Sequence, residues 1–319
     1  MNELRFDGRV VLVTGAGRGM GREHARLLAL RGARVVVSDV GADLFGRGRD
    51  VGPAEDAAAE IRADGGEAVA CALDLAAPDG PARTVQAAVD AFGRLDGLIH
   101  NAGFTLGACA FGEETPERLE RQLGVNTRAA FGLAREAWPL MSAQGCGRIV
   151  IAASTALYGL PGSLPYSTAK ASYIGLVRGL AAEGEACGIK VNLISPAAAT
   201  RMAANLAESA FKDWFMQTAR LDQVSPLAAL LAHASCPVNG ELFVVGGGRI
   251  ARTVIGETRG IVDPDMTIET VRDRMDEILA QPAAVQPRTT GEALAWFMEV
   301  LGQAPGAPIG AVAGKSDRA

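Results

Sequence analysis

Short runs of β-branched and apolar residues alternate along this chain with longer segments rich in alanine and leucine. Seven runs are predicted as strands, at residues 9–14, 33–39, 67–74, 95–100, 147–154, 189–195 and 241–246. Several are continuously apolar, which is typical of strands that are buried on both faces of a sheet. Helical segments lie between them, for example 22–32, 53–65 and 81–93. The alternation predicts a doubly wound α/β fold with a parallel sheet of about seven strands and right-handed crossovers.

Two segments depart from this alternation. A glycine-rich loop, 40–53, follows the second predicted strand, and the chain continues for some 70 residues beyond Gly248. Helices are predicted there at 266–280, opened by a capping Thr267, and at 292–301. We therefore expect a catalytic domain at 1–250, a helical C-terminal extension at 251–301 packed on that domain or on a partner subunit, and a flexible tail at 302–319.

Charge and cysteine content exclude several classes of protein. The chain has 319 residues and a formal net charge of −5, which argues against nucleic acid or an anionic membrane as the main partner. No apolar run reaches the roughly 18 residues of a membrane span, and the N-terminus has no apolar signal region. Five cysteines without zinc spacing predict reduced thiols, no metal site and a cytoplasmic location.

Thr14-Gly-Ala-Gly-Arg-Gly-Met-Gly21 follows the first predicted strand and precedes the first predicted helix. Glycines here allow a tight turn and let a pyrophosphate approach the amides of the helix N-terminus. The alternative is a glycine-rich turn without a ligand. Asp39 ends the second strand and predicts NAD, because a carboxylate accepts from ribose hydroxyls and repels a 2′-phosphate. Arg18 could favour that phosphate, but repulsion by Asp39 should dominate; the alternative for Asp39 is an ordinary strand-end aspartate.

Tyr166 precedes Lys170 by four residues, so the two side chains share one face of a predicted helix. A tyrosine, with a pKa of about 10, is a poor base at neutral pH. A nearby ammonium favours the phenolate, so we expect Lys170 to lower the pKa of Tyr166 and Tyr166 to act as an acid and base. The alternative is an ordinary pair of helical side chains.

Together these residues resemble the short-chain dehydrogenase/reductase family. The glycine turn, Asp74, Asn101-Ala-Gly103, Asn126, Tyr166-x-x-x-Lys170 and Pro196 occur in the family's order, over residues 6 to about 248. The resemblance implies that Asp74 binds adenine, Asn101 packs against the ribose, Thr200 contacts the nicotinamide amide or a phosphate, and Asn126 joins a water-linked proton relay to Lys170. The cofactor-binding residues expected are Gly15, Arg18, Gly19, Met20, Gly21, Asp39, Asp74, Leu75, Asn101, Ala102, Gly103, Tyr166, Lys170, Pro196 and Thr200.

The family also has a serine before the tyrosine. Its usual interval of thirteen residues, counted back from Tyr166, reaches Ala153, whereas counting along the strand from Arg148 reaches Ser154. Of these two sequence rulers, as we call the two counts, the count along the strand is the more reliable, because burial on both faces fixes the register of the strand. We therefore expect a one-residue deletion in the following loop and assign the catalytic hydroxyl to Ser154. In the alternative, Ser154 points away from the substrate oxygen and the active site is defective. Thr155 and Ser163 are weaker candidates for the hydroxyl.

Within the family, the loop after Asp39, the segment SPAAATRM and the C-terminal extension are similar to the (3R)-hydroxyacyl-CoA dehydrogenases of peroxisomal multifunctional enzymes and their bacterial relatives. The resemblance implies an NAD-dependent oxidation of a (3R)-hydroxyacyl-CoA by a homodimer or homotetramer, through helices at about 117–144 and 165–187. The alternatives are a hydroxysteroid or polyketide-type alcohol dehydrogenase and a non-catalytic cofactor-binding regulator. His100 and Ala197 depart from the family, which often has Asn and Gly at these positions.

Overall fold

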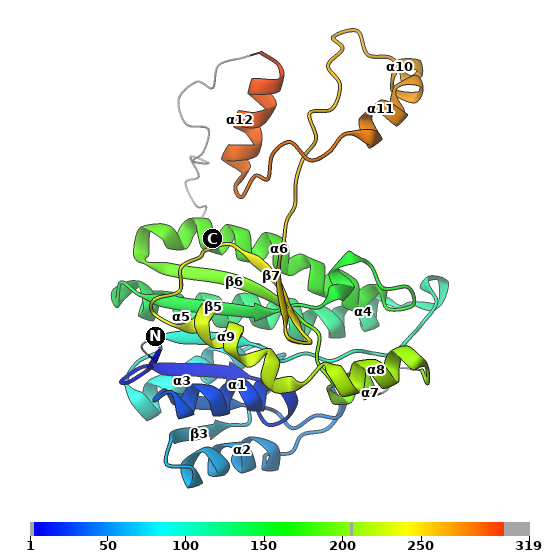
Figure 1. Cartoon of the computed structure of the whole chain (residues 1–319). Helices are drawn as coiled ribbons and strands as arrows, with labels where there is room; N and C mark the ends of the chain where they lie inside the picture. Colours follow the sequence, from blue (N-terminus) through cyan, green and yellow to red (C-terminus); the bar gives the residue numbers. More distant parts are fainter. Residues whose placement is uncertain (1–2, 205–206, 303–319) are drawn as a thin grey trace. The chain divides into compact units, whose positions relative to one another are not determined.

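An eight-stranded sheet forms the centre of the larger of two units, Met1–Thr253 and Val254–Ala319, into which the computed structural model divides. The structure describes residues 3–204 and 207–302. The strand order is β3-β2-β1-β4-β5-β6-β7-β8, parallel except for the antiparallel last pair (Figure 1). The strands are β1 (Val10–Thr14), β2 (Arg34–Ser38), β3 (Glu67–Cys71), β4 (Gly97–His100), β5 (Gly147–Ala152), β6 (Ile189–Pro196), β7 (Leu242–Gly246) and β8 (Arg249–Thr253).

Helices cover both faces of this sheet. In the first unit they are α1 (Gly19–Leu30), α2 (Gly52–Ala63), α3 (Gly80–Phe92), α4 (Pro116–Leu123), α5 (Ala129–Ala143), α6 (Leu164–Gly184), α7 (Arg201–Ala204), α8 (Ala210–Thr218) and α9 (Ser225–Ala232). Helices α1, α2 and α9 pack on one face, and α3, α5 and α6 pack on the other. The predicted doubly wound fold is confirmed. Within the described residues, each helix is too short or too polar to cross a membrane.

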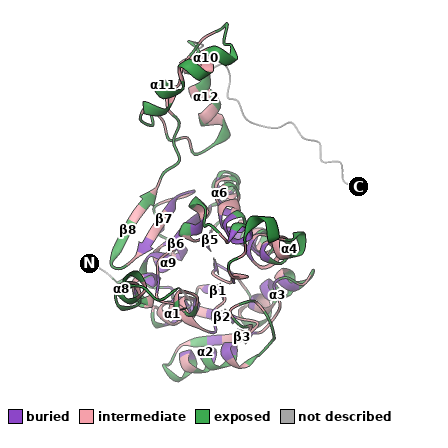
Figure 2. Ribbon diagram, turned by 90° about the vertical axis from the view of Figure 1, so that its right-hand side faces the viewer, coloured by how far each residue is buried: buried purple, intermediate pink, exposed green. Residues whose placement is uncertain are grey.

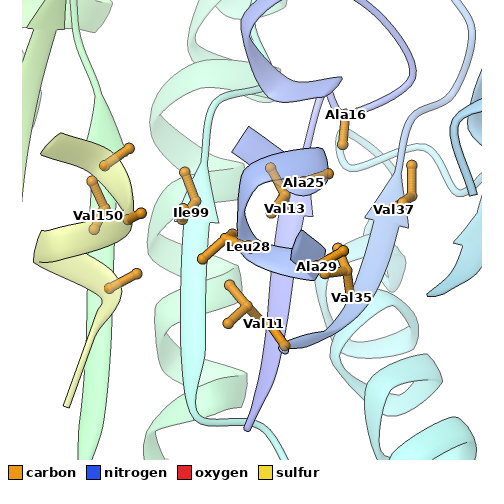
Figure 3. Packing of buried hydrophobic residues seen from close by; sticks show 14 of the residues in the cluster. Val11, Val13, Ala16, Ala25, Leu28, Ala29, Val35, Val37, Ile99 and Val150 are labelled. Carbon is orange, nitrogen blue, oxygen red and sulfur yellow. The ribbon is translucent and has the colours of Figure 1, made fainter. Parts of the chain in front are cut away.

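The period of two in a strand divides each central strand between two hydrophobic cores. In β1, Val11 and Val13 pack with α1, whereas Val10 and Leu12 face α3 and α5. Figure 3 shows the first core, where Leu28 of α1 lies over the strands. Buried residues accordingly concentrate in the strands and on the helix faces that meet them (Figure 2). This double burial explains why the strands read as continuous apolar runs rather than as alternating ones.

The structure has one strand more than the seven predicted. β8 follows β7 through Gly247 and Gly248, whose φ angles of +57° and +76° favour glycine, and pairs antiparallel with it. Its sequence, RIART, carries two arginines, and Ile250 is 56% exposed. An exposed edge strand needs no apolar run, so its sequence lacked the signal that identified the buried strands.

One predicted helix is interrupted. The segment expected as a helix over 117–144 forms α4, a π-helical turn at Gly124–Arg128, and α5. The turn contains Asn126, a residue of low helix propensity that is fully buried here. π-helical turns are typical of functional positions in helices, because the wider turn redirects side chains and main-chain groups. The interruption therefore gives the side chain and the carbonyl of Asn126 other directions than a continuous α-helix would.

The second unit contains α10 (Ile268–Asp273), α11 (Met275–Ala280) and α12 (Thr290–Val300). The segment expected as one helix over 266–280 is divided at Arg274, whose backbone is not helical. The Thr267 side chain caps α10 by accepting from the amide of Thr270 at 3.2 Å, as its sequence position indicated. The predicted tail lies, except for Gly302, outside the described residues.

Candidate active site

A cavity of about 1160 Å³ opens at the carboxyl ends of the parallel strands. Strand order reverses between β1 and β4, and ligands of doubly wound sheets bind in the crevice beside such a reversal. Its lining includes every cofactor-binding residue predicted from the sequence except Gly21. The cavity is large enough for a dinucleotide and part of a substrate, since ordinary ligand pockets measure about 300–1,000 Å³.

The glycine turn provides a close approach to main-chain amides at the start of α1. A Cβ added at Gly21 would collide with the main-chain oxygen of Gly15, and one added at Gly15 would lie 2.9 Å from Cα of Ala102. Gly15 and Gly19 also have φ angles of +63° and +54°. The N-cap residue, Arg18, is extended, and its side chain makes no capping bond to the described residues. The first amides of α1 are thus suited to a pyrophosphate.

Asp39 lies directly beside this turn. Its Oδ2 accepts from the amide of Gly17 at 2.9 Å, and its Oδ1 accepts from the amide of Gly41 at 2.8 Å. Each carboxylate oxygen has a second lone pair that remains available for a ribose hydroxyl. Arg18 turns toward the following loop, where its guanidinium donates to the oxygen of Ala42 at 3.5 Å and lies 3.9 Å from Asp50 Oδ2. Asp39 and Arg18 both line the cavity beside the glycine turn, and their roles toward an adenosine ribose stay predictions.

Asp74 and Leu75 line the cavity where the adenine is expected. Asp74 Oδ1 accepts from the amide of Ala76 at 2.9 Å, and Oδ2 accepts from the Arg49 guanidinium at 2.7 Å. Arg49 belongs to the glycine-rich loop after β2 and is missing from the residues predicted from the sequence. No local pattern could have found it, because the two partners lie 25 positions apart in the sequence and on different connections.

The segment directly after β4 consists of Asn101, Ala102 and Gly103. Hydrogen bonds of Asn101 and Ala102 join it to the start of the glycine turn. The Asn101 side chain donates to the main-chain oxygens of Thr14 and Gly15, at 3.2 Å each. Thr14 Oγ1 in turn accepts from the amides of Asn101 and Ala102 at 3.1 and 3.0 Å. Asn101 thus stabilises the glycine turn through hydrogen bonds. This structural role is sufficient to explain the asparagine, and it is also compatible with packing against a cofactor ribose.

Ser154, Tyr166 and Lys170 come together at the floor of the cavity. Tyr166 and Lys170, on α6, are 9% and 3% exposed. Burial raises the pKa of Tyr166, and a hydrogen bond with Ser154 lowers it in part. The pKa of Tyr166 is therefore raised, whereas the sequence led us to expect that Lys170 would lower it. Burial also lowers the pKa of Lys170 to about 7, while its Nζ donates to the main-chain oxygen of Ala152 at 2.9 Å.

The residues that the two sequence rulers reach, Ala153 and Ser154, both line the cavity. Ser154 Oγ also accepts from the amide of Ala156 at 3.2 Å, at the start of a short 3₁₀ turn. Ala153, by contrast, packs into the second hydrophobic core. Thr155 is exposed, and Ser163 lies at the N-cap of α6. Of the two positions only Ser154 carries a hydroxyl, and it interacts with the phenol of Tyr166; its catalytic role stays a prediction.

Asn126 lies close to Lys170. Its Nδ2 donates to the main-chain oxygen of Gln122 at 2.9 Å. Its Oδ1 is buried and has no hydrogen-bond partner among the described residues. A Cβ added to Gly103 would lie 2.8 Å from that Oδ1 and 3.3 Å from Lys170 Nζ. The amide oxygen and the ammonium therefore face a common point, where only a glycine fits.

Pro196, at the end of β6, and Thr200 also line the cavity. Thr200 Oγ1 accepts from the amide of Ala203 at 3.4 Å, so it also begins α7. The segment after Pro196 also supplies apolar side chains to the cavity. The structure identifies its aromatic lining residues as Phe211 and Phe215, which sit one turn apart on α8 with ring centroids 5.7 Å apart.

Comparison with known proteins accords with this geometry. The family model for short chain dehydrogenase matches residues 9–210. The chain belongs to the short-chain dehydrogenase family. It is therefore an oxidoreductase of a family that binds a nicotinamide cofactor, NAD or NADP.

Similarity extends beyond the family model. The chain is 39% identical over 303 residues to the peroxisomal multifunctional enzyme type 2 of Mus musculus, over 93% of this chain and 40% of that enzyme. Its structure resembles the full-length enzyme of Drosophila melanogaster (TM-score 0.77, 30% identity, 94% of this chain and 50% of that one). It also resembles a short chain dehydrogenase from Mycobacterium avium (TM-score 0.74, 35% identity, 88% and 98%). The chain thus spans half or less of the animal enzymes.

Proposed function

We propose that this protein is an NAD-dependent dehydrogenase that interconverts a (3R)-hydroxyacyl-CoA and the corresponding 3-ketoacyl-CoA. The observation that carries the proposal is the grouping of Ser154, Tyr166 and Lys170 at the floor of a dinucleotide-sized cleft. Similarity to peroxisomal multifunctional enzymes over 93% of the chain supports the acyl-CoA class. The five free cysteines support a reducing, cytoplasmic environment.

The cofactor preference rests on Asp39. Its carboxylate lies beside the uncapped start of α1 and would accept hydrogen bonds from a ribose diol. A 2′-phosphate placed there would meet a fixed negative charge, which favours NAD over NADP. Arg18 counteracts this preference only in part, because it lies close to Asp50 and donates to Ala42.

The chemistry of this chain is proton handling around one substrate oxygen. When bound, the nicotinamide ring supplies the hydride acceptor. Ser154 donates a hydrogen bond to the substrate oxygen, and Tyr166 removes the hydroxyl proton during oxidation. Because burial raises the pKa of Tyr166, the phenolate needs positive charge nearby. Lys170 supplies it in its ammonium form, and Asn126 Oδ1 would accept a hydrogen bond from a water that carries the proton onward.

The substrate assignment also rests on the mouth of the cavity. Phe211 and Phe215 offer an apolar wall for an acyl chain. Arg201, exposed at the start of α7, lines the same cavity, and a guanidinium suits a bidentate contact with phosphate. The phosphate-bearing CoA part of the substrate, its handle, would thus leave the cleft beside the guanidinium of Arg201.

An assay with matched stereoisomers tests this function. The (3R)- and (3S)-hydroxyacyl-CoA of one chain length are each incubated with NAD and with NADP, and absorbance of the reduced cofactor is followed. We expect turnover of the (3R) ester with NAD. Turnover of only a steroid or polyketide alcohol would leave the dehydrogenase chemistry and overturn the substrate class. Tight cofactor binding without turnover of any alcohol would support a non-catalytic regulator instead.

We also propose that residues 1–250 act as the catalytic domain and that the protein forms at least a dimer through the helices at 117–144 and 165–187. Phe131, on α5, is 56% exposed, which is unusual for a phenylalanine on a helix and suits an interface. The extension at 251–301 would pack on this domain or on the partner. Sedimentation at micromolar concentration tests the assembly, and a monomer would contradict it.

A further inference from the structure

His100 ends β4 at the position where the family often has asparagine, and it is 1% exposed. Its Nδ1 lies 3.1 Å from Thr14 Oγ1, and its Nε2 lies 3.2 Å from the main-chain oxygen of Asn126. The ring thus connects the strand before the glycine turn to the π-helical turn at 124–128. The cofactor-binding roles of the surrounding residues explain neither the contact of His100 with Thr14 nor its contact with Asn126.

The hydrogen-bond inventory of Thr14 fixes the tautomer of this ring. A hydroxyl has two acceptor lone pairs and one hydrogen. Thr14 Oγ1 already accepts from the amides of Asn101 and Ala102, so its hydrogen is the group left for His100 Nδ1. A neutral imidazole whose Nδ1 accepts carries its hydrogen on Nε2. Nε2 then donates to Asn126, whose carbonyl can only accept.

The surroundings keep the ring neutral. Burial, followed by the positive charge of Lys170, lowers the pKa of His100 to about 3. The other titratable group that faces the ring is Tyr173, which meets it edge-on with centroids 6.2 Å apart. An imidazolium would also place an N–H against the Thr14 oxygen, whose lone pairs are both in use. His100 is consequently a permanent, uncharged donor at neutral pH.

The acceptor of this donor is the residue whose amide oxygen faces Lys170. Asn126 is held at two points: its carbonyl by His100, and its Nδ2 by the oxygen of Gln122. With Nδ2 engaged, Oδ1 has to point toward the place beside Gly103 that Lys170 Nζ also faces. A shift of the π-helical turn would move Oδ1 away from that place, and geometric errors of this kind are costly in catalysis.

We infer that His100 is a positioning residue for the proposed dehydrogenase reaction, which as the neutral Nε2–H tautomer holds the Asn126 carbonyl and so directs Asn126 Oδ1 toward Lys170. The inference rests on the proposed function, because it assigns a task to the proton path. His100 itself moves no proton, because both of its nitrogens are engaged in a fixed direction. An asparagine, the family's frequent residue here, is too short to make both contacts.

Two variants separate the two contacts. An asparagine amide reaches only the position of Nδ1, so His100→Asn keeps the partner of Thr14 and loses the donor to Asn126. A glutamine amide reaches the position of Nε2, so His100→Gln keeps the donor and loses the partner of Thr14. Each variant removes one buried hydrogen bond, and the thermal midpoints should fall by similar amounts. The pair is thus matched for structural damage.

We expect His100→Asn to lower kcat about tenfold, on the scale of one buried hydrogen bond, with the KM for NAD changed less than about twofold. His100→Gln should recover most of this loss in kcat. Equal losses of kcat in both variants, in step with their thermal midpoints, would show a merely structural role and overturn the inference. So would full activity of His100→Asn.

The tautomer can be tested without turnover. The chain contains three histidines, so selective ¹⁵N-histidine labelling gives a simple spectrum, and His100→Gln assigns the signal of His100. Its ring should remain a neutral Nε2–H tautomer between about pH 5 and about pH 9. A neutral Nδ1–H tautomer, or protonation within this range, would overturn the inference. Because no substrate is needed, this failure is distinguishable from failure of the proposed function.

Discussion

Replacing Lys170 with methionine should stabilise the fold while it removes catalysis. The lysine is 3% exposed, and burial lowers its pKa from 10.5 to about 7. Each pKa unit corresponds to about 1.4 kcal/mol, so the buried charge costs about 5 kcal/mol below pH 7. Methionine has a similar length and no charge, but it leaves the main-chain oxygen of Ala152 without its donor, which costs about 1–3 kcal/mol. The net gain is about 2–4 kcal/mol at about pH 6.

The sign of the pH dependence follows from the direction of the shift. The folded pKa lies below the unfolded one, so between about pH 7 and about pH 10.5 the unfolded chain binds more protons, and stability rises with pH. At about pH 9 the cost of Lys170 has fallen to about 2 kcal/mol. The gain from Lys170→Met should therefore be about 3 kcal/mol smaller at about pH 9 than at about pH 6.

Equilibrium unfolding in urea, followed by tryptophan fluorescence at fixed protein concentration, measures this difference. Lys190→Met is the matched control: Lys190 also donates to a main-chain oxygen, that of Cys236, but its side chain is only partly buried. This variant controls for the loss of a lysine that donates to a main-chain oxygen. A gain for Lys170→Met that is equal at both pH values, or larger at about pH 9, would refute the reasoning about the buried ammonium.

Four further predictions concern cofactor and substrate. Asp39→Ala should weaken NAD more than NADP in titrations of both, and tighter NADP than NAD in the unmutated protein would contradict the ribose assignment. Gly21→Ala should abolish NAD binding in the same titration, because its Cβ would collide with the oxygen of Gly15. Ser154→Ala should lower kcat by roughly two to four decades, whereas Thr155→Ala should change it little; the reverse order would show the wrong register. Arg201→Ala should raise KM for the CoA ester more than for a β-hydroxy ester without the handle, and equal losses would remove Arg201 from the CoA site.

Most of the parallel sheet could be predicted from the sequence, because burial on both faces imposes a local pattern. β1 begins one residue after its predicted start, and β5 begins at its predicted start. The glycine turn was recognisable for the same reason, since a left-handed φ and a close main-chain approach require glycine at fixed spacings. β8 was not recognisable, because its exposed edge places few demands on the residues that form it.

The residue types at the expected catalytic positions can be read from the sequence, but two rulers remain for the serine. The contact of Ser154 with Tyr166, which supports the count along the strand, joins a strand end to a helix across a loop and is visible in the tertiary structure alone. The same holds for Arg49 with Asp74 and for His100 with Asn126, pairs 25 and 26 positions apart. The pKa of Lys170 also depends on the tertiary structure. The i,i+4 spacing indicates a neighbouring side chain, whereas desolvation depends on everything that packs around the ammonium.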